Sequence, residues 1–267
     1  LGNSPQMADR YDRSLREMIL RDRNHPSIVM WGLLNETNDG PVFRHAASTL
    51  PLVRSLDDTR MVMLNSGRWD IQAGASLTGL EIWNGAQDQD PNVTRNSLDV
   101  PLSGLGITWQ PKQLAFHPGP KGEFSVARWT VPEAGEYQID AVFSSIAQAA
   151  TTDVHVLRNG QTLHQGLINL NGAGNESAFS GKQALQAGDQ LDFVVGMGNG
   201  FYGADTTALA ACITRAGVVV ADAAKDFTVD PVKLSAWQYG SLTPGPIPDA
   251  KTFTRYTQSA TRGGSDP

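Results

Sequence analysis

Two polar clusters, each placed directly after an apolar run, hold the residues of this 267-residue chain best suited to chemistry. Asn35-Glu36 follows the apolar run 28–34, and a second cluster begins at Asn65. A glutamate at a strand end, against apolar groups such as Trp31, can have its pKa raised by desolvation and then act as a general acid or base. The plainer alternative is that Asn35 and Glu36 cap the next helix or start a polar loop.

The segments that would position these clusters alternate between helix and strand. Apolar side chains recur at helical spacing over 5–23, and Ser4 is expected to cap that helix. A strand over 27–34, predicted to be buried on both faces, a helix over about 42–56 and a strand over 60–64 follow. This order is typical of a parallel α/β fold, in which sites form at the carboxyl ends of the strands.

Residues 21–36, which read RDRNHPSIVMWGLLNE, closely resemble the segment leading to the general acid/base of family 2 glycoside hydrolases, the β-galactosidase and β-glucuronidase group. The resemblance implies that Asn35 and Glu36 end the fourth strand of a (β/α)8 TIM barrel. It also implies that Glu36 protonates the leaving-group oxygen and that Asn35 hydrogen-bonds the sugar 2-hydroxyl. A glutamate suits this role because breaking a glycosidic bond needs a carboxylic acid that is protonated near neutral pH.

The later segment 64–70, LNSGRWD, is similar to the end of the fifth strand in one branch of that family, although it is shorter. The resemblance implies that Asn65, Arg68 and Trp69 contact the substrate. Residues 1–72 are therefore expected to be part of a glycosidase barrel.

A retaining glycosidase needs a second carboxylate about 5 Å from the first. The family places this nucleophile at a strand end, typically followed by Tyr-Gly, and no such triplet occurs here. Glu136-Tyr137 is followed by Gln138, and no barrel pattern surrounds Glu81, so neither glutamate is nominated. We therefore expect the complete protein to be a retaining O-glycosyl hydrolase and this chain to be an incomplete, inactive catalytic unit.

After residue 70 the pattern changes to short strands separated by Gly, Pro, Asn and Asp turns. Asn159-Gly160 predicts a type I′ hairpin, because both positions of that turn need positive φ. Residues 73–222 are predicted to form an all-β, jelly-roll-like sandwich, and 223–267 a Pro/Gly-rich linker or the start of a second sandwich module. The predicted strands are 124–131, 137–143, 152–157, 161–167, 190–195 and 209–214.

Residues 82–214 resemble sandwich modules attached to bacterial carbohydrate-active enzymes, through the segments 116–120, 126–132 and 187–189. The resemblance implies a carbohydrate-binding or spacer module. Four tryptophans are candidates for a sugar-stacking platform: Trp83, Trp109, Trp129 and Trp237. Trp129 lies within a predicted strand, so a core position suits it equally well.

Composition bounds the remaining possibilities. A net charge of −6, a pI near 5.3 and the absence of any Lys/Arg-rich run argue against nucleic acid as a partner. No apolar run reaches 18 residues, so no membrane-spanning helix is expected. The single cysteine, Cys212, has apolar neighbours and is predicted to be a buried small hydrophobe. His117 is predicted to be a turn residue, and Asp189, Asp192 and Asp205 match no calcium loop, so no metal or other cofactor is predicted.

Three functional hypotheses follow. The first is a glycoside hydrolase fused to a sandwich module, with carbohydrate as its partner and the periplasm or cell exterior as its location. The second is a non-catalytic sugar-binding protein with a vestigial barrel segment, and the third is a sandwich that only joins domains. The sequence does not determine the sugar, the linkage or the oligomeric state.

Overall fold

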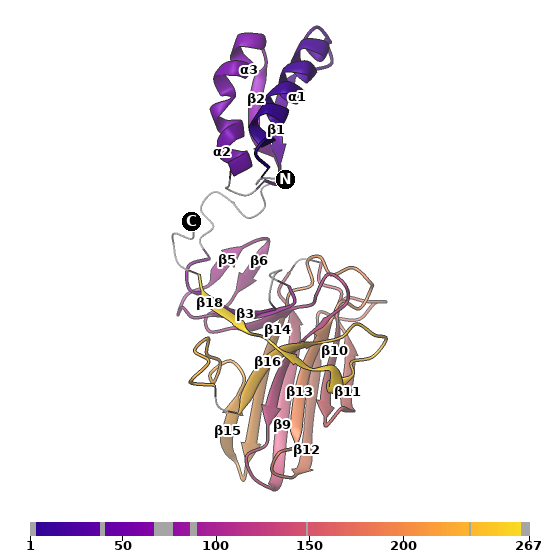
Figure 1. Cartoon of the computed structure of the whole chain (residues 1–267). Helices are drawn as coiled ribbons and strands as arrows, with labels where there is room; N and C mark the ends of the chain where they lie inside the picture. The colour runs from indigo at the N-terminus through magenta and orange to yellow at the C-terminus, as the bar shows by residue number, and fades with distance from the viewer. Residues whose placement is uncertain are drawn as a thin grey trace. The chain divides into compact units, whose positions relative to one another are not determined.

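The structure is a computed structural model, and it divides the chain into two compact units, residues 1–75 and 76–266 (Figure 1). It describes residues 4–37, 41–66, 77–85, 90–147, 149–234 and 236–262.

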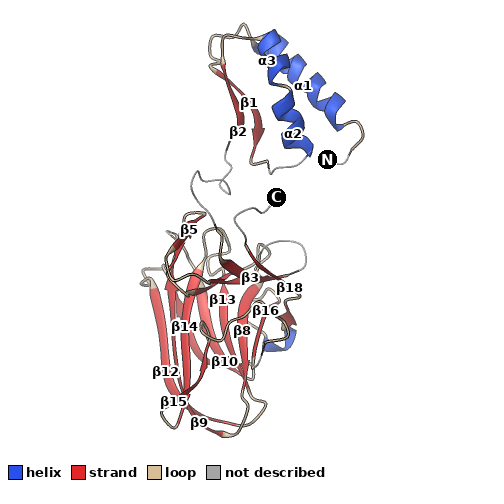
Figure 2. Cartoon of the chain, turned by 90° about the vertical axis from the view of Figure 1, so that its left-hand side faces the viewer, coloured by secondary structure: helices blue, strands red, loops and turns tan. Residues whose placement is uncertain are grey.

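The first unit is a two-stranded parallel sheet with helices packed on one of its faces (Figure 2). Met30 pairs with Met61, and the register continues to Asn35 and Ser66. The core of the unit consists of Leu15, Ile19, Trp31, Leu33 and Val53. The elements in chain order are α1 (Met7–Asp22), β1 (Met30–Asn35), α2 (Pro41–Ser48), α3 (Leu50–Leu56) and β2 (Met61–Ser66).

Two details of the predicted helices are wrong. The helix expected over 42–56 is broken at Thr49, and α3 restarts with a proline in its first turn. The break is expected from Pro51, because proline lacks the N–H that a continuous helix would use. Ser4 does not cap α1: the N-cap position is Gln6, and the Ser4 hydroxyl donates to the Gln6 side chain instead.

β1 is buried on one face only, contrary to the prediction of burial on both. Trp31 and Leu33 face the helices, whereas Met30 is 38% exposed and Met61, its partner on β2, is 68% exposed. The physical reason is that the described residues supply a helical layer to one face of this sheet and no second layer to the other.

One buried carboxylate ties the elements of this unit together. Asp57 accepts hydrogen bonds from Trp31 Nε1 at 2.9 Å and from Arg60 Nη1 at 2.7 Å, and it also accepts from Thr59. These donors hold the pKa of Asp57 well below its usual range, the Thr59 hydroxyl making the largest contribution. Arg60 also donates to the Ile28 carbonyl, so the network fixes the start of β2 against the chain that leads into β1.

The second unit is a β-sandwich. One sheet has the order β11-β10-β13-β8-β16-β17, and the other has the order β12-β9-β14-β7-β4-β3-β18, with β15 added beside β14. Its strands are β3 (Leu80–Asn84), β4 (Asn92–Asn96), β5 (Leu102–Gly104), β6 (Ile107–Trp109), β7 (Leu114–His117), β8 (Phe124–Thr130), β9 (Gly135–Ser145), β10 (Asp153–Arg158), β11 (Gln161–Leu167), β12 (Glu176–Leu185), β13 (Gln190–Gly196), β14 (Thr207–Arg215), β15 (Val218–Asp222), β16 (Trp237–Leu242), β17 (Thr254–Arg255) and β18 (Gln258–Thr261).

The predicted hairpin is confirmed. β10 and β11 are antiparallel, and Arg158 pairs with Gln161 across a two-residue turn. The φ angles of Asn159 and Gly160 are 50° and 82°, the positive values that a type I′ turn requires.

The segment 223–267 is neither a linker nor the start of another module, because its described strands complete this sandwich. Trp237 of β16 pairs with Trp129 of β8, and β18 pairs with β3. Trp237 and Tyr239 are each 1% exposed and belong to the core between the sheets.

The strand β12 was missed in the sequence. Its outward positions are exposed and its inward positions, such as Phe179 and Gly181, are only half-buried. No apolar alternation marks such a strand, and it is defined by its ten paired residues with β9.

Trp237→Ala is expected to destabilise the sandwich by about 3 to 5 kcal/mol, because it leaves a large cavity in the core. Urea unfolding followed by circular dichroism measures this change. Val232→Ala, at a position 90% exposed, is the control and should change the stability little. Equal, small effects of both substitutions would contradict the assignment of β16 to the core.

The first unit is expected to open more readily than the second. β1 has β2 as its single strand partner among the described residues, whereas β8 and β13 each have strands on both sides. In hydrogen exchange, β1 and β2 amides should exchange at least about 100-fold faster than those of β8 and β13. Equal, strong protection in both units would contradict this expectation.

Candidate active site

The predicted site residues that the structure describes lie together at the carboxyl ends of β1 and β2. Because the strands are parallel, Leu34 pairs with Asn65 and Asn35 with Ser66, and Glu36 follows immediately. Two further predicted substrate contacts, Arg68 and Trp69, lie outside the described residues.

Hydrogen bonds between the two strand ends fix this cluster. The Glu36 amide donates to the Ser66 carbonyl at 2.7 Å, and the Ser66 hydroxyl donates to Asn35 Oδ1 at 2.7 Å. The Asn65 side chain donates to the Thr37 carbonyl at 2.9 Å and accepts from the Thr37 amide at 3.3 Å. Asn65 therefore holds the chain that follows Glu36, a positioning role that sequence reasoning missed.

The backbone of Glu36 adopts a left-handed conformation, with φ of 47°. This region is uncommon for residues other than glycine, and such conformations cluster at functional sites, where the surroundings enforce them. Here the surroundings are the hydrogen bonds on either side, to Ser66 and to Thr37.

Trp31 does not form the apolar wall expected beside Glu36. Its ring is 3% exposed, lies under the helices and donates to Asp57, whereas Asn35 and Glu36 are exposed. The strand alternation explains the difference, because the side chain of Trp31 points to the helix-covered face.

The four tryptophans considered as a sugar platform are core residues. Trp83 and Trp109 are each 3% exposed, and Trp129 and Trp237 are each 1% exposed. Three of the indole N–H groups are satisfied inside the protein: Trp83 donates to the Thr228 carbonyl, Trp109 to the Thr94 hydroxyl and Trp237 to Asp226. Trp83, Trp129 and Trp237 pack in the main core and Trp109 in a smaller cluster with Leu80, Leu102 and Ala115, so none of the four rings can stack on a ligand.

The remaining polar candidates have structural partners. Contrary to the prediction, His117 is not in a turn but is the last residue of β7, paired with Asn92, and its Nδ1 lies 2.9 Å from the Pro118 carbonyl. Asp189 accepts from Asn159 and Asp192 from Arg128. Within the described residues, no three His, Cys, Asp or Glu side chains are grouped so that they could hold a metal ion.

Cys212 is half-buried on β14, so the prediction of a buried hydrophobe is wrong. Burial raises the pKa of its thiol, and Asp222, Asp140 and Asp226 raise it further. The thiol is therefore a weak nucleophile near neutral pH.

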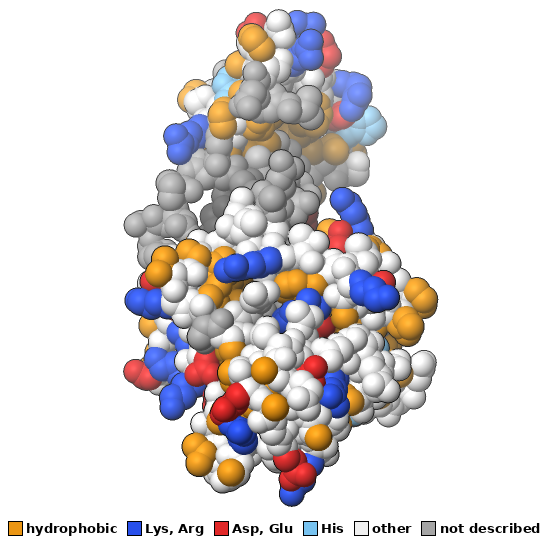
Figure 3. All heavy atoms as spheres, turned by 60° about the horizontal axis from the view of Figure 1, so that its bottom comes forward, with side chains coloured by type: hydrophobic (Ala, Val, Ile, Leu, Met, Phe, Trp, Pro, Cys, Tyr) orange, Lys and Arg blue, Asp and Glu red, His pale blue; other side chains and the backbone are white. Residues whose placement is uncertain are grey.

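The surface agrees with the overall composition. On the face drawn in Figure 3, acidic and basic side chains are interspersed and neither gathers into a continuous patch. Among the described helices, none is long and apolar enough to cross a bilayer.

Comparison with known proteins connects this site to a family. Residues 1–97 match the family described as glycosyl hydrolases family 2, TIM barrel domain. A β-galactosidase of Vibrio vulnificus is 48% identical over 40 residues, which are 15% of this chain and 4% of that enzyme. A β-galactosidase of Alteromonas mediterranea is 37% identical over 73 residues, which are 27% of this chain and 7% of that enzyme.

The first part of the chain therefore resembles a segment of the barrel domain of glycoside hydrolase family 2. The aligned regions span only a small fraction of the curated relatives.

Solved structures with some likeness to this chain include two carbohydrate-binding modules. A family 51 module from Clostridium perfringens, in complex with methyl-galactose, is 14% identical with a TM-score of 0.30, covering 48% of this chain and 90% of the module. A family 35 module from an environmental isolate is 11% identical with a TM-score of 0.23, covering 53% of this chain and 93% of the module. Scores this low assign neither fold nor function.

Asp205 is a buried carboxyl, and its burial was not predicted from the sequence. It is fully buried, Oδ1 accepts from the Thr151 amide at 2.6 Å, and Oδ2 has no partner in the described structure. Burial raises its pKa from 3.8 to about 7. Because the pKa is raised in the folded state, the proton on Asp205 stabilises the fold. This stabilisation is fully present below pH 3.8 and is lost as the pH rises through about 7.

Asp205→Asn is therefore expected to remove a pH-dependent loss of stability. The free energy of unfolding of the variant relative to the wild type should rise between pH 4 and pH 8 by about 2 to 4 kcal/mol. Urea unfolding at a series of pH values measures it, with Asp249→Asn, at the exposed N-cap of the short helix 250–252, as the control. Parallel stability curves for wild type and Asp205→Asn would contradict the burial argument.

Proposed function

We propose that the complete protein hydrolyses O-glycosidic bonds with retention of configuration, and that Glu36 is its general acid/base. The observation that carries the proposal is the placement of Asn35 and Glu36 at the carboxyl end of a parallel strand, locked to the neighbouring strand end through Ser66. The family match of the same residues supports it.

In the proposed mechanism, Glu36 protonates the leaving-group oxygen and then, as a carboxylate, activates the water that completes hydrolysis. Asn35 holds the sugar 2-hydroxyl through its Nδ2 donor, because its Oδ1 already accepts from Ser66. A hydrogen bond at this hydroxyl can strengthen as positive charge develops on the ring. Arg68 and Trp69 are proposed as substrate contacts on the family resemblance.

We propose that the second carboxylate is not among the described residues of this chain. Glu81 forms an ion pair with Arg95 in the sandwich, and Glu136 lies on an exposed face of β9. We therefore expect the 267-residue chain alone to be inactive on aryl β-galactosides, β-glucosides and β-glucuronides. Turnover that survives purification and disappears in Glu36→Gln would contradict this expectation.

We also propose that the sandwich binds a carbohydrate polymer and that the protein acts in the periplasm or outside the cell, where such polymers are met. The buried tryptophans remove the stacking platform first considered, so another surface must supply the contact. A sandwich that only joins domains is the alternative, and it predicts no retention in affinity gels containing any polysaccharide.

In the complete enzyme, Glu36→Gln should slow substrates with poor leaving groups about 10² to 10⁴-fold more than activated ones, because only poor leaving groups need a proton from the enzyme. Asn35→Ala should depress both substrate types, since its contact lies on the sugar. The measurement is kcat/KM for dinitrophenyl and alkyl glycosides, together with rescue of Glu36→Ala by azide. Equal losses for Glu36→Gln on both substrates, with no azide adduct, would assign Glu36 another role.

A further inference from the structure

A segment from the end of the chain crosses the outer face of the six-stranded sheet. Residues 243–253, which we call the strap, follow β16, include the short helix η1 (Ala250–Thr252) and return to pair through β17. Ala250 and Phe253 of the strap pack on an outer apolar cluster: Phe124, Val126, Leu157, Val194 and Leu242. The strap therefore covers the apolar part of this face.

At the edge of the strap the sheet carries a buried ion pair. Arg128 of β8 and Asp192 of β13 are 6% and 0% exposed and are joined by two hydrogen bonds, of 2.6 and 2.8 Å. Arg128 also donates to the Ala250 carbonyl at 2.9 Å, and its guanidinium carbon lies 4.0 Å from the centre of the Phe253 ring. Burying such a pair carries a desolvation cost that apolar residues would avoid, so stability alone does not explain why it is there.

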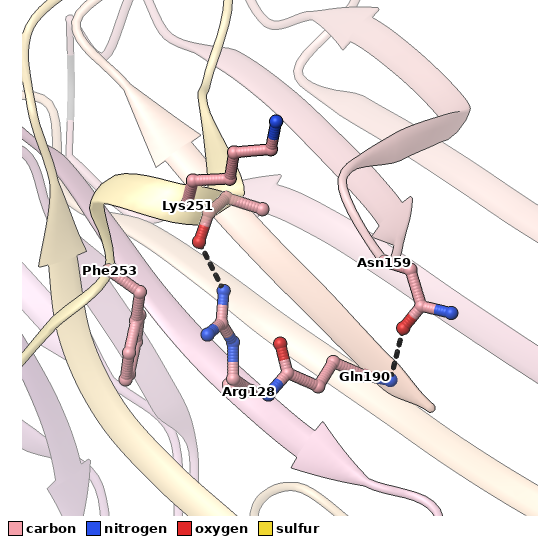
Figure 4. A pocket seen from close by; sticks show the side chains of 6 residues that line it. Arg128, Asn159, Gln190, Lys251 and Phe253 are labelled. Atoms are coloured by element: carbon pink, nitrogen blue, oxygen red, sulfur yellow. Dashed lines mark hydrogen bonds between the residues drawn. The ribbon is translucent and has the colours of Figure 1, made fainter. Parts of the chain in front are cut away.

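A pocket of about 300 Å³ opens beside this ion pair (Figure 4). The strap and Arg128 form one side of it, and Asn159 and Gln190 form the other. The Asn159 side chain is held at both ends, since its Oδ1 accepts from the Gln190 backbone N–H and its Nδ2 donates to Asp189. Asn159 is therefore a fixed wall, and Figure 4 shows the Gln190 side chain extending from beside it toward Arg128.

Several donors and one acceptor at this pocket have no partner among the described residues. The donors are the Gln190 side-chain N–H groups, the Lys251 ammonium and Arg128 Nη1, and the acceptor is the Gln190 side-chain carbonyl. The other nitrogens of Arg128, Nε and Nη2, are bound to Asp192 and Ala250. A hydroxylated ligand offers both donors and acceptors, and an amide can serve both. The volume lies at the lower end of the range for small-molecule sites, about 300 to 1,000 Å³, which leaves room for one ring.

We propose that this pocket binds one neutral, hexose-sized sugar residue of a carbohydrate chain, through Gln190, Lys251 and Arg128. Charge argues against an anionic ligand, because Asp192 neutralises Arg128 and the strap also carries the Asp249 carboxylate, which accepts a hydrogen bond from the Lys251 backbone N–H. The choice of carbohydrate rests on the proposed binding function of the sandwich. The geometry adds which surface performs it: the outer face of the six-stranded sheet, opposite the core into which Trp129, the neighbour of Arg128, is buried.

The test is a titration of the isotope-labelled 267-residue chain with galactose, glucose, mannose, xylose and glucuronate, followed by nuclear magnetic resonance. The Gln190 side-chain amide signals are expected to shift with a dissociation constant of roughly millimolar size. Gln190→Ala and Lys251→Ala should each weaken binding about ten-fold. Gln110→Ala and Lys225→Ala are the matched controls outside the pocket and should change it less than about two-fold.

Each alternative outcome has a distinct meaning. Sugar binding that survives both pocket substitutions overturns the pocket and leaves binding by the sandwich in place. No binding of any of these sugars overturns both the pocket and the binding function, while the role of Glu36 is judged by its own kinetics. Glucuronate bound more than about ten-fold more tightly than glucose would overturn the neutral-sugar assignment.

Discussion

The parallel register of β1 and β2 is the constraint on which the candidate active site depends. It brings two strand ends that are 31 residues apart in the chain into hydrogen-bonding distance, with Asn35 opposite Ser66. The Ser66 carbonyl then holds the Glu36 amide, and the Asn65 side chain holds Thr37, which together enforce the left-handed backbone of Glu36. The Asp57 network supports this register from the opposite end of the strands, because Arg60 ties the start of β2 to Ile28.

In the second unit, the alternation of side chains along each strand decides whether a residue lies in the core between the sheets or on an outer face. Large aromatic rings at inward positions, such as Trp129 and Trp237, fill the space between the sheets and are removed from any binding role. On the outer face of the six-stranded sheet the strap covers the apolar positions and stops at the Arg128–Asp192 pair. Polar groups that remain open at that edge define the pocket proposed to bind sugar.

Much of the local structure could be predicted from the sequence, because it depends on local chemistry. The Asn159-Gly160 turn follows from the φ preferences of two residues, and its strands end where the turn requires. The apolar run before Asn35 predicted a strand with a polar end. Predictions failed where a distant partner decides the outcome: β12 has little apolar pattern of its own and is held by β9, and β16 lies in a Pro/Gly-rich stretch yet is held by β8.

The sequence by itself determined that the chain begins as an α/β unit, continues as β-strands and carries an Asn-Glu pair after an apolar strand, since these features are written in spacing and residue type. Tertiary structure alone decided which face of each strand is buried. It turned the tryptophans inward, made Asn65 a support for the Glu36 backbone and buried Asp205 without a partner for Oδ2. The physical reason is that burial and hydrogen-bond satisfaction are set by the layer packed against a residue, which comes from another part of the chain.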